Sequence, residues 1–405
     1  MAAVLPQIAP PPALFEASRF DPEFEFLLAC CRGTELFAQK VNWQRVAEVS
    51  QEHGAVPHVY EKLCGRIADA DLAPIGKIYC ANLRKAMLLT RELLRIYREL
   101  KACGVNVLSY KGPALACQLY GDVAARQFSD LDLLVQPADA PRAQAVLRQL
   151  GYEQPHKLTC GQEVSYLRSG YEYTFDGALG RNVVELKWAV APRFYAIDLS
   201  VNRLFEQAVE IEIAGQRLTT LCAEDALLVL CIHAARHQWC ELSWLCDLSR
   251  MQQVCELDWN SVRESAAQLG ISRILAISFL LANELLGTPV PGTFRRDSVA
   301  QQMVEQLSRT ITFRNEYDPE SLAYFRMMMQ VRERWQDRAR MLTRLAFTPG
   351  IGEWNAVRLP DAMFGFYSAV RIGRLVKRFS SRSSKPTPKK LDSPEPPEAV
   401  LHPPG

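Results

Sequence analysis

The fold is decided by Leu108–Val135, which reads LSYKGPALACQLYGDVAARQFSDLDLLV. The β-branched run VNVLSY, which enters this segment from residue 105, predicts a first strand, and LDLLV at its end predicts a second. Between them PALACQLY, with proline in its first turn, is typical of a short helix, and GDVAARQFS indicates a loop. A helix over Pro141–Leu150, N-capped by Asp139 and ended by Gly151, extends the pattern to strand–helix–strand–helix.

The next segment is expected to add the remaining strands of the same unit. Val164–Leu167 and Tyr171–Phe175 are two strand candidates. The glycine-rich DGALGR then leads into a third, NVVELKWAV at residues 182–190, which is a hairpin signal. Residues 105–220 are therefore predicted to form a mixed α/β unit with at least four strands.

Helical regions are expected on both sides of this unit, because apolar residues recur there at a spacing of three to four. The clearest helix before it is Arg84–Ala102, which Gly104 ends. Its expected buried stripe consists of Met87, Leu88, Leu93, Leu94, Tyr97 and Leu100. After the unit, helices are expected at Ala223–Arg236, Cys240–Gln253, Ile271–Leu286, Arg314–Leu345 and Phe364–Phe379, with a loop at Thr348–Asp361.

The predicted fold class is α+β. A small mixed sheet in residues 105–220 is flanked by an N-terminal helical region over 20–104 and a C-terminal helical domain over 221–379. Residues 1–19 are expected to be a flexible N-terminus. In residues 380–405, seven prolines stand among serine and lysine, a composition that cannot build a core and that predicts a disordered tail.

Charge is distributed unevenly along the chain. The 405 residues include 47 Lys+Arg and 45 Asp+Glu, and the 48% of hydrophobic residues excludes a wholly disordered or fibrous chain. Residues 326–382 carry +8 and residues 1–325 carry −6, which disfavours extended nucleic-acid binding by the acidic body. Acidic residues interrupt Arg332–Arg344, so we expect a solvated helix face there. The basic helix at 364–379 is expected to pack on the body, with peripheral contact to an acidic partner or a membrane surface as the alternative.

The expected compartment is the cytoplasm. The start, MAAVLPQIAPPPALF, lacks the basic region of a secretory signal, and the most apolar stretch, Ile274–Ala282, is shorter than the ~20 residues of a spanning helix. None of the 12 cysteines forms a CxxC pair, which argues against zinc-ribbon and thioredoxin-type sites. Most of them are expected to be free, buried thiols.

The residues with the clearest chemistry lie on the second strand. Asp130 and Asp132 are two residues apart, so alternation places both carboxylates on one face, while Leu131 and Leu133 point into the core. Two carboxylates held this close repel each other. A divalent cation between their oxygens is the main reason for a protein to place them so.

A phosphate-binding feature and a third acid accompany this pair. Lys111-Gly112 ends the first strand and precedes a helix, where backbone N–H groups can approach a phosphate. In NVVELKWAV, Glu185 lies on the polar face of an otherwise buried strand, and Lys187 shares that face. This layout is typical of a metal-dependent phosphoryl or nucleotidyl transferase, in which two metals bridge the carboxylates and a triphosphate.

Plainer interpretations of these residues remain open. The aspartates can be a solvated strand edge, and Glu185 can form a salt bridge with Lys187 or an arginine. Lys111 and Arg126 can be surface charges that touch no phosphate.

The helical segment after residue 223 contains a second group of polar and aromatic residues. His233 and His237 are four apart, and we interpret them as packing or pocket residues, because a zinc pair needs a third ligand and no HExxH motif is present. Trp239 and Trp244 are expected in the core, with Asp247 capped or paired.

The chain resembles the uncharacterised nucleotidyltransferase family of the DNA-polymerase-β-like superfamily. The resemblance covers much of residues 25–379 and is carried by LSYKGPALACQLYGDVAARQFSDLDLLV, the next helix ending in LGYE, VVELKWAV, EDALLVLCIHAARHQW, LSWLCDLSRM and LPDAMFGFYSAVRIGRLVKRF. Its central block is the specific part. The chain departs from the family in having Gly112-Pro113 in place of Gly-Ser or Gly-Gly, a longer loop over Ala114–Ser129, and Lys187 where relatives often carry histidine.

The resemblance implies a transferase that moves a nucleoside monophosphate from a nucleoside triphosphate to an unknown acceptor and releases pyrophosphate. It implies that Asp130, Asp132 and Glu185 are catalytic and bind Mg²⁺ or Mn²⁺. It implies that Lys111 and Gly112 lie near the triphosphate and that Arg126 can reach a phosphate. Ser129 and Lys187 are also expected in the nucleotide site, with the role of Lys187 open. The acceptor would be a small molecule, a peptide or a protein, with nucleic acid less favoured. The alternative is a non-catalytic binding or scaffold protein that retains the nucleotidyltransferase fold.

Overall fold

The computed structural model describes residues 20–34, 40–155, 158–177, 182–294, 297–311 and 321–380. The expectations of a flexible 1–19 and of a disordered tail beyond residue 380 lie outside these residues. Within them, no helix combines the length and apolar character needed to cross a membrane.

A four-stranded mixed sheet forms the centre of the molecule. Its strand order is β1-β2-β4-β3, with β1 at Val107–Ser109, β2 at Asp130–Val135, β3 at Glu172–Asp176 and β4 at Val183–Lys187. β2 runs parallel to β4 and antiparallel to β1, while β3 and β4 form the expected antiparallel hairpin. A separate hairpin joins β5 (Val209–Ile213) and β6 (Gln216–Thr220), so the prediction of at least four strands is confirmed.

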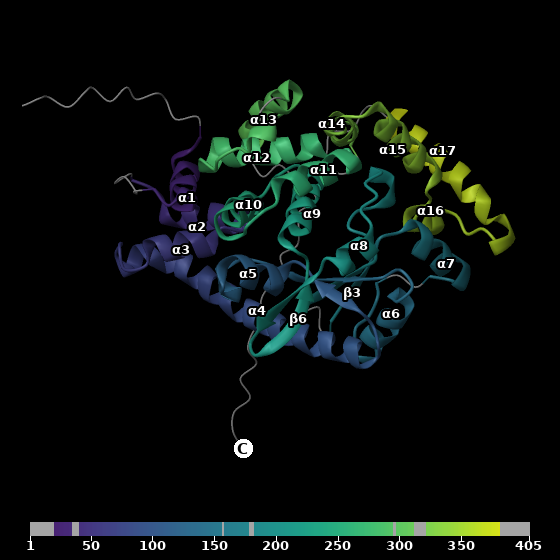
Figure 1. The fold of residues 1–405 in the computed structure, drawn as a ribbon, viewed down its shortest axis with the longest axis horizontal. Helices are drawn as coiled ribbons and strands as arrows, with labels where there is room; N and C mark the ends of the chain where they lie inside the picture. Colours follow the sequence, from purple (N-terminus) through teal and green to yellow (C-terminus); the bar gives the residue numbers. More distant parts are fainter. Residues whose placement is uncertain are drawn as a thin grey trace, which may run out of the picture.

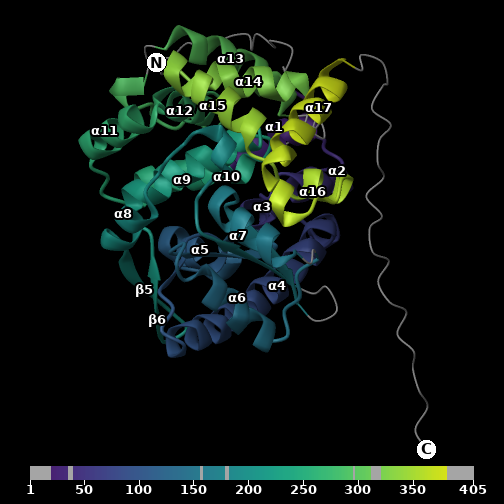
Figure 2. The same cartoon turned by 90° about the vertical axis from the view of Figure 1, so that its right-hand side faces the viewer.

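The two faces of the sheet belong to different cores. On β2, Leu131 and Leu133 join a core with α4 (Asp69–Ala102) and α6 (Ala140–Gln149), whereas Leu134 joins a core with the C-terminal helices. In both ribbon views α4 and α6 lie on one side of the sheet, and α9 (Ala223–Arg236) and α10 (Leu242–Val254) lie on the other (Figures 1 and 2). The face that carries the even-numbered residues of β2 therefore looks toward the C-terminal helices.

The remaining helices surround the sheet, and α9–α12 (residues 223–286) lie on the side away from α4 (Figure 1). Their bounds are α1 Pro22–Arg32, α2 Trp43–Glu52, α3 Val56–Leu63, α5 Gly112–Tyr120, α7 Cys160–Ser169, α8 Val201–Glu206, α9 Ala223–Arg236, α10 Leu242–Val254, α11 Trp259–Leu269, α12 Ser272–Leu286, α13 Ser298–Thr310, α14 Leu322–Val331, α15 Trp335–Phe347, α16 Ile351–Ala356 and α17 Tyr367–Ser380. The first and last regions share one core, since buried residues of α1–α3 and α9–α12 belong to the same cluster. Arg32 Nε donates to the Leu285 carbonyl at 2.7 Å across that contact. The α+β fold class is confirmed.

Some local expectations are wrong. Val164–Leu167 is not a strand but part of α7, because Thr159 and Gln162 form a capping box that starts a helix there. The expected loop at 348–361 contains α16. The long helix expected to end at residue 345 is divided in its described part between α14 and α15.

The expected stripe of α4 is confirmed in its second part and wrong at its start. Leu93, Leu94, Tyr97 and Leu100 are buried, whereas Met87 and Leu88 are each 60% exposed. A spacing of three to four back from Leu93 leads to the buried Leu89 and Ala86, and Met87 and Leu88 fall between these core-facing positions.

The arginine-rich segment is not a solvated face throughout. Arg332 is 0% exposed, and its Nη2 donates to the carbonyls of Ala196 and Leu269. The same Nη2 lies 3.3 Å from the Asp337 carboxylate, which is equally buried. The helix breaks between α14 and α15 at this point, and the break turns Arg332 inward.

Two further expectations need correction. Asp139 lies at the N-cap of α6, but no backbone N–H donates to its side chain, and it pairs with Arg142 at 2.5 Å instead. All 12 cysteines are free thiols, yet only Cys30, Cys231 and Cys246 are buried.

Candidate metal and nucleotide site

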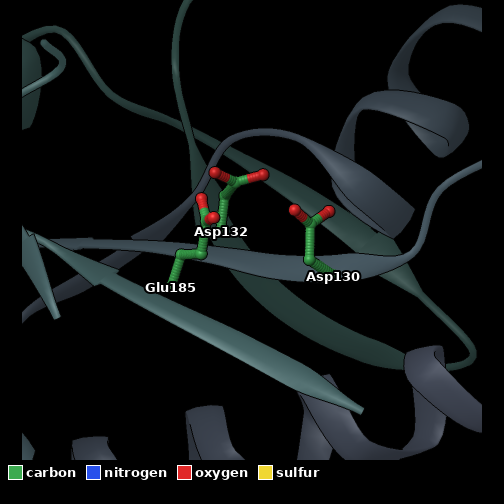
Figure 3. A group of neighbouring side chains, drawn as sticks. All are labelled: Asp130, Asp132 and Glu185. Atoms are coloured by element: carbon green, nitrogen blue, oxygen red, sulfur yellow. The ribbon is translucent and has the colours of Figure 1, made fainter. Parts of the chain in front are cut away.

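Three carboxylates meet where β2 and β4 run side by side. In the parallel register Asp132 is the partner of Glu185, and Asp130 is two residues before Asp132 on the same face. The three side chains project from the same side of the two strands (Figure 3). One oxygen from each lies within 4.8 Å of the others, and within the described residues this is the one group of three acidic, histidine or cysteine side chains so arranged.

Strand alternation explains why the charges can gather here. Leu131, Leu133 and Leu186 are at most 1% exposed and fix the opposite face of the sheet in the core with α4 and α6. A slip of one residue would bury the carboxylates in that core, so the register is strongly specified. Asp132 is 2% exposed even on the polar face, which requires partners for its charge.

Two lysines supply those partners. Lys111 Nζ lies 3.1 Å from Asp132 Oδ1, and Lys187 Nζ lies 3.2 Å from the same oxygen. Lys187 Nζ also lies 2.5 Å from Glu185 Oε2 and 2.8 Å from Glu172 Oε2. Glu172 was missed from the sequence, although alternation along Tyr171–Phe175 places it beside Lys187 once β3 and β4 are paired.

The electrostatics divide the carboxylates into two kinds. Burial raises the pKa of Asp130, and the charge of Asp132 raises it further. Burial likewise raises the pKa of Glu185, against the pull of Lys187. For Asp132 burial is outweighed by Lys111 and Lys187, which hold its pKa below the ordinary range. Asp130 and Glu185 are therefore anions that a bound cation would stabilise.

Gly112 brings the start of α5 against this cluster. Its φ is +52°, and a Cβ at this position would lie 3.3 Å from the Asp130 carbonyl oxygen. Glycine is needed for both the left-handed backbone and the close approach. The predicted phosphate-binding turn is thus adjacent to Asp130, with Pro113 in the first turn of the helix, and the exposed Ser129 directly precedes β2.

Arg126 has a different immediate partner from the one expected. Its side chain is 8% exposed, and its Nε donates to Asp247 Oδ2 at 2.8 Å. Tyr120 donates to the other oxygen of Asp247 at 3.0 Å. The pairing expected for Asp247 is confirmed, and a phosphate contact of Arg126 stays a prediction.

Helix α9 lies beside the cluster and contacts it through His233. His233 Nδ1 lies 3.4 Å from Lys111 Nζ, and its ring packs against His237 and Trp244 at centroid distances of 4.6 and 5.1 Å. An ammonium group only donates, so Nδ1 accepts and Nε2 carries the imidazole proton. The guanidinium of Arg236 lies over the Tyr171 ring at 5.1 Å. The packing role expected for the two histidines is confirmed.

Both histidines are expected to stay neutral across physiological pH. Burial lowers the pKa of His237 to about 3, helped by the charges of Arg236 and Lys111, and burial with Lys111 holds the pKa of His233 well below its usual range. Their ring resonances in NMR spectra should not titrate between about pH 5 and 8. Because the unfolded chain protonates them below about pH 6.5, stability should fall as the pH decreases from there.

Assignment of these resonances requires two variants. His233→Gln and His237→Gln should each remove one ring from the spectrum and leave the rest in place. A titration midpoint near 6.5 for either ring would contradict the buried, neutral assignment.

One comparison with known proteins identifies a family. The family model described as "Uncharacterised nucleotidyltransferase" matches residues 39–287, which extend from before α2 through the sheet and α9 to just past α12. The late segment at 359–379 that contributes to the resemblance lies outside the match. No curated protein and no solved structure matches the chain. Since the model covers more than half of the sequence, the chain belongs to the uncharacterised nucleotidyltransferase family.

Proposed function

We propose that the protein is a metal-dependent nucleotidyltransferase. An oxygen of the acceptor would attack the α-phosphorus of a nucleoside triphosphate, and the bond to the β-phosphate oxygen would break to release pyrophosphate. The observation that supports this most is the meeting of Asp130, Asp132 and Glu185 on adjacent parallel strands in a chain of this family. Buried carboxylates without a matching number of basic partners favour a cation.

The donor set fits a hard divalent cation such as Mg²⁺ or Mn²⁺. All three side chains offer carboxylate oxygens, and no sulfur or imidazole belongs to the group. Asp130, Asp132 and Glu185 would hold the ion, which supplies positive charge for the phosphate oxygens. Lys111 and the backbone at Gly112 would face the triphosphate from the start of α5.

The acceptor is proposed to be a small molecule, a peptide or a protein. An extended nucleic acid requires free basic side chains. In the described C-terminal helices several arginines are already paired: Arg344 with Asp198 at 2.6 Å, and Arg371 and Arg374 with Glu353 at 3.0 and 3.1 Å. These pairs reduce what the basic region can offer to phosphates.

The proposal is tested by following radiolabel from the α-phosphate and from the γ-phosphate of the nucleotide separately. With each of the four common triphosphates and Mg²⁺, label from the α-phosphate should appear on acceptors in a cell extract, and label from the γ-phosphate should be released as pyrophosphate. Transfer of the γ-label instead would identify phosphoryl transfer. Absence of nucleotide binding at millimolar concentration in calorimetry would favour the scaffold alternative.

A further inference from the structure

Lys187 occupies an unusual place in the acidic cluster. Its Nζ contacts carboxylates from three strands, namely Asp132 on β2, Glu172 on β3 and Glu185 on β4. The side chain is 4% exposed, so its ammonium group has little access to water. Moving a buried ammonium group away from three carboxylates costs free energy, because the carboxylates would be left buried without a counter-charge.

Glu172 holds Lys187 in this place. The two residues are direct partners in the antiparallel pairing of β3 with β4, and their charged atoms are 2.8 Å apart. The Tyr171 ring lies 5.7 Å from Nζ on another side. If a metal ion displaced Lys187, Glu172 would lose the ion pair that the strand register gives it.

The lysines contact only some of the carboxylate oxygens, so other oxygens are available to a metal ion. Lys111 and Lys187 both contact Asp132 Oδ1, and Lys187 contacts Glu185 Oε2. Within the described residues, the Asp130 carboxylate takes part in no hydrogen bond or ion pair, and the closest lysine contacts of Asp132 and Glu185 use Oδ1 and Oε2, leaving Oδ2 and Oε1 as the more distant oxygens. The available oxygens come from all three carboxylates, which is enough to ligate one cation.

The formal charge also favours a single cation. The four carboxylates of Asp130, Asp132, Glu172 and Glu185 and the two ammonium groups leave −2, and the guanidinium of Arg236, on which the charge of Glu172 acts, reduces this negative charge further. Arg126 does not change this balance, because Asp247 pairs with it. A second divalent cation would leave a buried excess of positive charge until a nucleotide arrives.

We propose that the site holds a single divalent cation and that the Lys187 ammonium group stands where a second metal ion would otherwise bind. The inference rests on the proposed nucleotidyltransferase function. In it, the Lys187 ammonium group supplies the positive charge that a second metal ion would otherwise bring to the site. Glu172 is then a positioning residue for Lys187 and not a metal ligand.

Mn²⁺ binding tests this directly, because two Mn²⁺ ions roughly 3.5–4 Å apart give an exchange-coupled EPR spectrum and a single ion does not. Metal-free protein is titrated with Mn²⁺, alone and with an equimolar α,β-methylene triphosphate of each common nucleoside. The intact protein should bind one Mn²⁺ per chain with an uncoupled spectrum in both cases. Lys187→Met, which removes the charge at similar volume, should bind a second, coupled Mn²⁺.

Lys187→Arg is the matched control, because it keeps the charge and should stay at one ion. Circular dichroism shows whether the variants fold. If Lys187→Met does not fold, the number of Mn²⁺ ions bound by the intact protein decides between one and two metal ions. Two coupled ions in the intact protein would overturn the inference and leave nucleotidyl transfer standing. A folded Lys187→Met that still binds one ion would overturn the role of Lys187. No Mn²⁺ binding at all would overturn the metal site itself, and with it the proposed function.

Discussion

Asp130→Asn is expected to lower nucleotidyl transfer by at least about a thousandfold, since metal stabilisation of charge contributes several kcal/mol and each 1.36 kcal/mol is tenfold in rate. Both oxygens of Asp130 are without a described hydrogen bond or ion pair, so its carboxylate is the one most completely available to a cation. An amide offers one neutral oxygen in its place and loses the charge.

The same substitution should leave the fold intact or make it more stable without metal. Burial and Asp132 raise the pKa of Asp130, so in the folded state the ionised carboxylate is disfavoured. A raised carboxyl pKa lowers stability at pH values above it, and asparagine removes this penalty. Asp132→Asn is the informative contrast. It removes the counter-charge of Lys111 and Lys187 and should lower the melting temperature as well as the activity.

The measurement combines transfer of an α-phosphate label with thermal unfolding in the presence of a chelator. Loss of transfer with an unchanged or higher melting temperature for Asp130→Asn is the expected result. If a folded Asp130→Asn protein transferred the label as fast as the intact protein, the assignment of Asp130 as a catalytic residue would be wrong. A melting temperature that falls as far as in Asp132→Asn would instead assign Asp130 a structural role.

The sequence was most informative where one strand alternates strictly. In residues 130–133 the period of two separates the two carboxylates from Leu131 and Leu133, so the strand, its polar face and the approach of Glu185 could all be anticipated. The contacts of Lys187 could not be anticipated in the same way, because they include Glu172, which lies on β3, a strand antiparallel to β4. Side-chain contacts across antiparallel partners follow from register, and register was not known from one strand alone.

Contacts between residues far apart in the chain could not be predicted from local sequence patterns either, because they depend on how the elements pack. The meeting of His233 with Lys111 joins positions 122 residues apart in the chain. Arg332 looked like part of a charged helix surface, yet the end of α14 turns it into the body, where it bonds to the Ala196 carbonyl. Composition identifies such a side chain as charged, but only tertiary packing decides whether the charge is solvated or paired.

Arg126→Met is expected to destabilise the protein by about 3–5 kcal/mol, the usual cost of removing one member of a buried ion pair. Arg126 and Asp247 have side-chain exposures of 9% and 1%, and the pair joins the loop before β2 to α10 of the C-terminal body. The variant leaves the Asp247 carboxylate buried, with Tyr120 as the remaining donor. Chemical denaturation at neutral pH measures the loss.

The double variant Arg126→Met with Asp247→Asn separates ion pairing from other effects. Asparagine keeps an oxygen for the Tyr120 hydroxyl and removes the charge, so the double variant should recover much of the stability lost in Arg126→Met. Arg45→Met is a matched control, because Arg45 and Glu48 are 44% and 47% exposed, and breaking such a surface pair should cost only about 0–1 kcal/mol. If Arg126→Met unfolds at the same denaturant concentration as the Arg45 control, the buried pair is not what holds the sheet against the C-terminal helices.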